Sequence, residues 1–151
     1  MKKNIVRLFV LVSFLAVHTL SFSAVTYTKD KDYRVFHTDS MPDYTVTGFP
    51  SRCNPNTASK QDITVKVPLN PQYESRTYEL VIPNKFGIMM DGVIIEPNAD
   101  EYWSADHSTP CQPNDSSQKS AWPYAALSQY VNFGFDQSNA HVQPSGLYHY
   151  H

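Results

Sequence analysis

The chain has 151 residues and a formal net charge of −2, with ten Tyr, eight Phe and eleven Pro. This length suffices for one domain with a real core and leaves little room for a second. The lack of a basic excess argues against nucleic acid as a partner, and the aromatic, proline-rich composition favours β-strands over long helices.

The first 23 residues have the pattern of a secretory signal peptide. Three basic residues (Lys2, Lys3 and Arg7) precede an almost wholly apolar run from Leu8 to Leu20. We expect cleavage after Ser23, because the run is shorter than the ~20 apolar residues that span a bilayer. An uncleaved anchor is the alternative. The mature chain would have nine basic and fourteen acidic residues, would not span a membrane, and would be secreted or periplasmic.

The rest of the chain predicts a lead-in over residues 24–43 and a single domain over 44–151. Alternation of apolar and polar side chains predicts strands, each bounded by proline or by turn residues. These are Tyr33–His37, Tyr44–Thr47, Ile63–Val67 and Thr77–Ile82. We expect an antiparallel, mainly β, sandwich-like fold with one short helix.

The middle of the chain predicts a hairpin, a long loop and the helix. Asp91-Gly92 lies between two apolar triplets (88–90 and 93–95), which is typical of a two-residue type I′ turn. Residues 97–120 are polar and irregular and predict a loop. Ser120–Tyr130 predicts the helix, with Ser120 as its cap and Pro123 in its first turn.

The only two cysteines, Cys53 and Cys111, both lie in the exported part. An oxidising compartment favours a disulfide between them. The alternative, a metal ligand or a reactive thiol, remains open at this point, because sequence does not give the geometry of the pair.

The C-terminal residues 141–151 contain three of the six histidines. Pro144-Ser145-Gly146 has the composition of a three-residue hairpin loop, with glycine in the left-handed position. In that register His141 is opposite His149, and alternation places His151 on the same face. Three imidazoles then converge, while the tyrosines project from the other face.

Converging neutral imidazoles are suitable ligands for a divalent transition metal such as zinc or copper. We predict a metal site of His141, His149 and His151 with Glu101 as a partner; Asp106, His107 and Asp136 are other candidates for a fourth ligand. In the alternative interpretation the tyrosines pack in the core and the histidines are solvated or hydrogen-bonded to neighbours.

Three functions follow from this face of the hairpin. The first is metal binding, and the second is a metal-free module that binds an unidentified small molecule or another protein of the cell envelope. A hydrolase with a histidine as proton carrier comes third, because no nucleophile motif such as Gly-x-Ser-x-Gly is present. The sequence assigns no catalytic residue.

The tail from Asn139 to Pro144, then Ser145-Gly146 and Tyr148-His149-Tyr150-His151, resembles the hallmark of the YHYH family of exported proteins. Further stretches agree with that family: Gly48-Phe49-Pro50, Asn54–Thr57, Phe86–Ile88, Asp91–Val93, Glu101–Trp103, Trp122 and Tyr124–Leu127. The resemblance implies an exported, mainly β domain and supplies no reaction.

Two features depart from the family pattern. A glycine is common where Cys53 stands, so the bridge to Cys111 would be peculiar to this branch. The family usually continues past the motif with a Gly-Leu-Pro-like segment, whereas this chain stops at His151, which leaves a truncated C-terminus as one interpretation.

Overall fold

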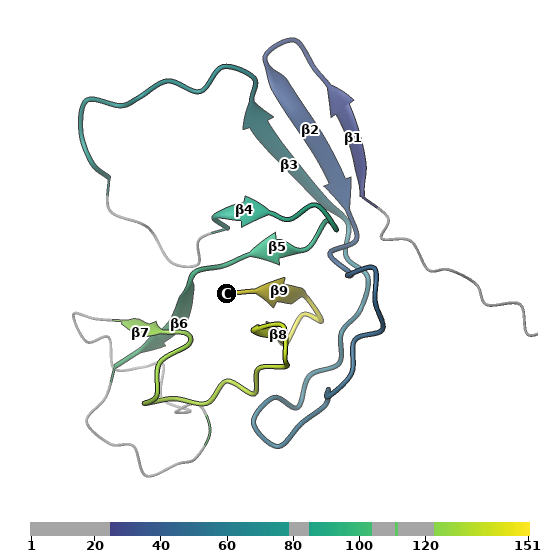
Figure 1. Cartoon of the computed structure of the whole chain (residues 1–151), viewed down its shortest axis with the longest axis vertical. Coiled ribbons are helices and arrows are strands. Elements are labelled where there is room, and N and C mark those ends of the chain that lie inside the picture. Colours follow the sequence, from purple (N-terminus) through teal and green to yellow (C-terminus); the bar gives the residue numbers. More distant parts are fainter. Residues whose placement is uncertain (1–24, 79–84, 104–110, 112–122) are drawn as a thin grey trace, which may run out of the picture.

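A computed structural model describes residues 25–78, 85–103, 111 and 123–151. Within these ranges the protein is mainly β and contains no helix. Its strands form three sheets, of three, four and two strands (Figure 1). The signal peptide predicted for residues 1–23 lies outside the described residues, and no helix among those described is long and apolar enough to cross a membrane.

The first sheet contains β1 (Thr26–Lys29), β2 (Tyr33–Thr38) and β3 (Ile63–Pro68), all antiparallel. Side chains along β3 alternate between half-buried and exposed, as its period-two sequence predicts. The predicted strands at 33–37 and 63–67 are therefore confirmed, whereas β1 falls in the predicted lead-in.

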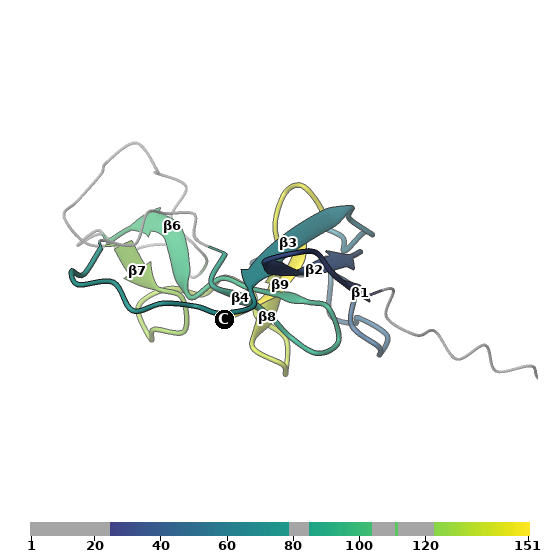
Figure 2. The same ribbon diagram turned by 90° about the horizontal axis from the view of Figure 1, so that it is seen from above.

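The second sheet holds the C-terminal motif. Its strand order is β4 (Gly87–Ile88), β5 (Ile94–Ile95), β9 (Tyr148–Tyr150) and β8 (Ala140–Val142). All pairs are antiparallel except β5 and β9, which run parallel. Figures 1 and 2 show this sheet in the centre of the molecule, between the other two. Its core cluster comprises Val93, Ala140, Val142 and Tyr148.

The hairpin between β4 and β5 exists, but its predicted type I′ turn is wrong. The amide of Gly92 donates to the Met89 carbonyl at 2.9 Å, and the amide of Met89 donates to the Val93 carbonyl at 2.9 Å. The loop therefore has three residues, and Gly92, at φ 88°, is the one with positive φ in this turn. A type I′ turn would need positive φ at Asp91 too.

The third sheet pairs β6 (Asn98–Tyr102) with β7 (Pro123–Ala125). Two predictions are wrong here: β6 lies in the predicted loop, and β7 lies in the predicted helix. The side chain of Tyr124 is buried in a second core cluster with Ala99, Ala126 and Phe133. Tertiary burial of this tyrosine prevails over the weak helix propensity of a short segment.

Two other predicted strands have different outcomes. Residues 44–47 form no strand; Val46 instead packs against the central core cluster, so the alternation there reflects tertiary packing without a pairing partner. In the predicted strand at 77–82, residues 77 and 78 form no strand, and 79–82 lie outside the described residues.

The disulfide prediction is confirmed. Cys53 and Cys111 are bonded, with an S–S distance of 2.09 Å, and neither is a free thiol. The bridge connects the loop after Phe49 to a position 58 residues later in the chain. This excludes a reactive thiol at either position in this state of the protein.

Candidate metal centre

The hairpin of β8 and β9 has the register that its sequence predicts. His141 is opposite His149, and Val142 is opposite Tyr148. The Gly146 amide donates to the Gln143 carbonyl at 2.8 Å, and Gly146 has φ 86°. A Cβ at this glycine would collide with the Ser59 hydroxyl, which would have to rotate away, and would lie 3.2 Å from the Ser59 Cβ, so the turn requires glycine and the neighbouring loop leaves little room for a side chain.

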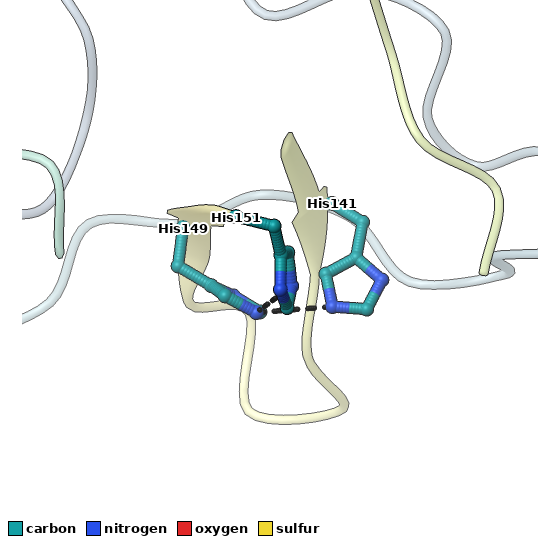
Figure 3. A group of neighbouring side chains, drawn as sticks. All are labelled: His141, His149 and His151. Atoms are coloured by element: carbon teal, nitrogen blue, oxygen red, sulfur yellow. Dashed lines mark hydrogen bonds between the residues drawn. The ribbon is translucent and has the colours of Figure 1, made fainter. Parts of the chain in front are cut away.

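The three predicted histidines meet on one face of this hairpin (Figure 3). The Nε2 atoms of His141 and His149 are 3.0 Å apart, and so are those of His149 and His151. One ligand atom from each of the three residues lies within 4.8 Å of the other two. The group has the geometry to hold a metal ion.

Backbone carbonyls fix the tautomers of two of these rings. Nδ1 of His141 lies 3.2 Å from the Phe133 carbonyl oxygen, and Nδ1 of His149 lies 3.4 Å from the Leu147 carbonyl oxygen. A carbonyl only accepts, so each Nδ1 carries the proton and each Nε2 presents a lone pair. Two lone pairs thus face each other at 3.0 Å, an arrangement that a cation between them would stabilise.

Burial of the imidazole rings makes it unfavourable for a proton to supply the positive charge between these nitrogen atoms. His149 is 1% exposed, and desolvation lowers its pKa to about 3, helped by the neighbouring histidines. Desolvation also lowers the pKa of His151 to about 4 and lowers the pKa of His141. The three rings are therefore neutral at physiological pH, the form in which imidazole binds metals.

Aromatic rings enclose one side of the cluster. Phe135 stacks on His141, with centroids 4.9 Å apart, and meets His151 edge-on at 5.0 Å. Phe133 packs edge-on against His141 at 5.8 Å. These contacts restrict ring rotation and shield the nitrogen atoms from water on that side.

The cluster also lines a pocket of about 270 Å³, whose described wall contains neither Phe133 nor Phe135. The pocket wall also includes Glu96, Asp100 and Glu101, together with polar amide side chains. Burial raises the pKa of each of these three carboxyl groups. Glu101, predicted as a metal partner, thus lies in the same pocket as the histidines but outside the group of mutually close ligand atoms.

Sequence reasoning missed Glu96. This buried carboxylate places Oε2 3.8 Å from Nε2 of His149 and accepts a hydrogen bond of 2.7 Å from the Gln143 side chain. Its position follows from the parallel pairing of β5 with β9, extended by the Glu96 amide, which donates to the Tyr150 carbonyl at 2.9 Å. No local pattern indicates a parallel pairing across more than fifty residues.

The structure does not place the other residues that we predicted as a fourth ligand beside the histidines. Asp136 is not with the histidines; its Oδ2 accepts a hydrogen bond of 2.6 Å from the Tyr148 hydroxyl on the opposite face of the hairpin. Asp106 and His107 lie outside the described residues.

A tyrosine network occupies that opposite face. The Tyr44 hydroxyl lies 2.8 Å from that of Tyr148 and 3.2 Å from that of Tyr150. Tyr150 donates to Asp91 at 2.7 Å. The alternating Tyr-His-Tyr-His sequence therefore anchors the strand through its tyrosines and presents its histidines to the pocket.

Two asparagines hold the strand that carries His141. The Asn54 side-chain amide donates to the carbonyls of Phe133 and Val142, at 3.3 and 3.0 Å. The Asn56 side-chain amide donates to the Val142 carbonyl as well, at 2.7 Å. Asn54 and His141 thus share the Phe133 carbonyl, which couples the loop at 53–57 to the orientation of the imidazole.

Comparison with protein families assigns the chain. The family model described as "YHYH protein" matches residues 64–151, more than half of the sequence. The chain therefore belongs to the YHYH family, as its C-terminal motif indicates. No curated protein and no solved structure matches it.

Proposed function

We propose that this protein is an exported domain that binds one divalent transition-metal ion, zinc or copper, through Nε2 of His141, His149 and His151. The proposal rests on one observation above all: two tautomers fixed by backbone carbonyls aim two Nε2 lone pairs at each other across 3.0 Å. In water-exposed rings such an arrangement would relax by rotation.

The spacing of the nitrogen atoms suits such an ion. Tetrahedral ligation with metal–nitrogen bonds of 2.0–2.1 Å separates two ligand nitrogens by about 3.3 Å. The two short Nε2 distances of 3.0 Å need only small adjustments of the rings to reach that value. Three neutral nitrogen donors suit zinc and copper(II) and are poor ligands for calcium or magnesium, which prefer oxygen.

Two features support the part of the proposal that places the domain outside the cytoplasm. The disulfide between Cys53 and Cys111 is of a kind that persists in oxidising compartments. A signal peptide over residues 1–23 would deliver the domain there.

The proposal is tested by elemental analysis of the mature protein, purified without an affinity tag. We expect close to one equivalent of zinc or copper per chain, and a strong loss of that metal in the His149→Ala/His151→Ala double variant. His37→Ala is the matched control, because His37 is an exposed histidine on β2, away from the cluster. Equal trace metal in the parent and in both variants would refute metal binding.

A metal-free binding module is the second candidate, favoured by the pocket of about 270 Å³ with its polar wall. It predicts that a small molecule or an envelope protein binds equally well to parent protein treated with a chelator. Binding that requires added metal would reject it.

A further inference from the structure

The metal ligands all come from one hairpin, so they approach an ion from one side. Among the described residues, the group of mutually close ligand atoms contains the three histidines and no carboxylate. Zinc sites with three protein ligands keep a fourth position for an exogenous ligand, and four is the usual minimum for this ion.

Glu96 is close to this position without filling it. Its Oε2 is 3.8 Å from the His149 nitrogen and is held by the Gln143 amide at 2.7 Å. The carboxylate thus stands to one side of the cluster, next to His149, where it can accept a hydrogen bond from a ligand bound to the ion.

The pocket of about 270 Å³ gives access to the same place. It is lined by all three histidines and by Glu96, Asp100 and Glu101. Its volume falls just below the range of about 300–1,000 Å³ that is usual for small-molecule sites, so it suits a small ligand.

The chemistry of the wall discriminates among ligands. Carboxylates accept hydrogen bonds, and among the described residues that line the pocket none is a lysine or an arginine. Lys85 interacts electrostatically with Glu96 but does not line the pocket. An anionic ligand would therefore meet repulsion from the wall, whereas a neutral ligand with N–H groups would gain hydrogen bonds.

Resting on the proposed function, we propose that the metal ion keeps one coordination position open to this pocket. That position accepts a small neutral molecule that coordinates through nitrogen and donates an N–H hydrogen bond to the Glu96 and Glu101 carboxylates. Binding replaces one metal–oxygen bond, to the water molecule that leaves, with one metal–nitrogen bond, and the oxidation state of the metal does not change.

The experiment uses the mature protein loaded with copper(II), with imidazole and azide as probes. Electron paramagnetic resonance counts the nitrogen ligands, and the visible spectrum gives a dissociation constant for each probe. We expect imidazole to add a nitrogen signal to the parent spectrum. In a Glu96→Gln/Glu101→Gln variant we expect azide to bind about three- to tenfold more tightly, since two negative charges near the ion are removed.

Controls separate this inference from the function on which it rests. Asp62→Asn, which removes an exposed carboxylate just before β3, should change neither constant. Copper that binds stoichiometrically but responds to neither probe would mean that the protein itself closes the fourth position, which overturns the inference and leaves metal binding intact. An azide affinity unchanged in the double variant would overturn the selectivity of the pocket. Failure to load copper at all would instead refute the proposed function.

Discussion

At the scale of single residues, the site depends on groups that sequence reasoning treats as turn or loop chemistry. Asn54 appears in a loop rich in Pro, Asn and Ser, yet its amide bridges the carbonyls of Phe133 and Val142. Gly146 appears as a turn residue, yet Ser59 also lies so close that a side chain at position 146 would displace the Ser59 hydroxyl. The role of each residue in its own turn or loop was predictable from sequence. Its second role depends on contact with a residue that is distant in the chain, and sequence reasoning did not predict it.

Gly146→Ala should lower the free energy of unfolding, by about 2 kcal/mol or more, because it combines positive φ with a steric collision at Ser59. Gly48→Ala isolates the backbone term, since Gly48 has φ 89° but no atom within 4 Å of an added Cβ. It should cost about 1 kcal/mol. Urea denaturation measures both, and equal losses in the two variants would exclude the collision as a cause.

The histidines should also make the metal-free protein sensitive to acid. The pKa values of His149 (about 3) and His151 (about 4) are lower in the folded protein than the usual 6.5. As pH falls below about 6.5, the unfolded chain takes up protons that the folded protein does not, so the free energy of unfolding decreases. The free energy of unfolding therefore has its full value, as far as these histidines are concerned, above pH 6.5. It decreases progressively as the pH falls toward 3–4.

Urea denaturation in the presence of a chelator, at intervals from pH 7.5 to pH 5, measures this slope. Each histidine contributes up to about 1.4 kcal/mol per pH unit. The series stops at pH 5 to limit the opposite contribution of Glu96, Asp100 and Glu101, whose raised pKa values make the folded protein take up protons more readily than the unfolded chain as the pH falls. His151→Gln should reduce the slope; an unchanged slope would show that this ring is not buried in its neutral form.

At the scale of elements, the C-terminal hairpin was the most predictable part of the fold. Its turn composition sets the loop length, and loop length sets the register, so the opposition of His141 and His149 follows from local rules. The same rules chose the wrong turn for residues 89–93, because Asp91-Gly92 is compatible with both two- and three-residue loops. The sequence of residues 120–130 does not distinguish the strand at 123–125 from the helix that we predicted there.

The tyrosine face gives a prediction at this scale. Tyr148→Phe should destabilise the protein by about 1.5–3 kcal/mol, because the buried ring loses its hydrogen bond to the Asp136 carboxylate. The metal affinity should change less than threefold, since the histidines project from the other face. Tyr27→Phe is the control, since Tyr27 is half exposed on β1. Metal loss in Tyr148→Phe equal to that of a histidine variant would contradict the division of the two faces.

At the scale of the whole molecule, the disulfide joins Cys53 to Cys111 across a sequence separation of 58 residues, and the chain segment that it closes carries Glu96 and Glu101. Loop entropy assigns about 4 kcal/mol to a closure of this length. We expect a reductant to lower the thermal midpoint of the parent protein and to leave a Cys53→Ser/Cys111→Ser variant unchanged. If the parent keeps its midpoint after reduction, with both thiols verified as free, the bridge does not constrain the fold.

The sandwich arrangement, the single domain over 44–151 and the signal peptide stay predictions. The described strands divide among three sheets, and β2 pairs with β3 across a long loop. Thr38 and Ser40 connect this sheet to the central one through hydrogen bonds to the carbonyls of Gly92 and Tyr148. Those contacts join the segment predicted as a lead-in to the strand pair that carries the site.

The sequence by itself determined the mainly β character and the family, and it predicted the convergence of three histidines, because each depends on composition, on a motif or on the two-residue period of a hairpin. It favoured the disulfide over a free thiol, and the tertiary structure decided that question by bringing Cys53 and Cys111 together. The tertiary structure alone placed Glu96 beside His149, Asn54 behind His141 and Asp136 on the tyrosine face. These placements follow from pairings between segments far apart in the chain, such as β5 with β9, which local residue patterns do not specify. Local sequence rules thus place the three histidines on one face of the hairpin, and long-range packing decides what surrounds this candidate metal site.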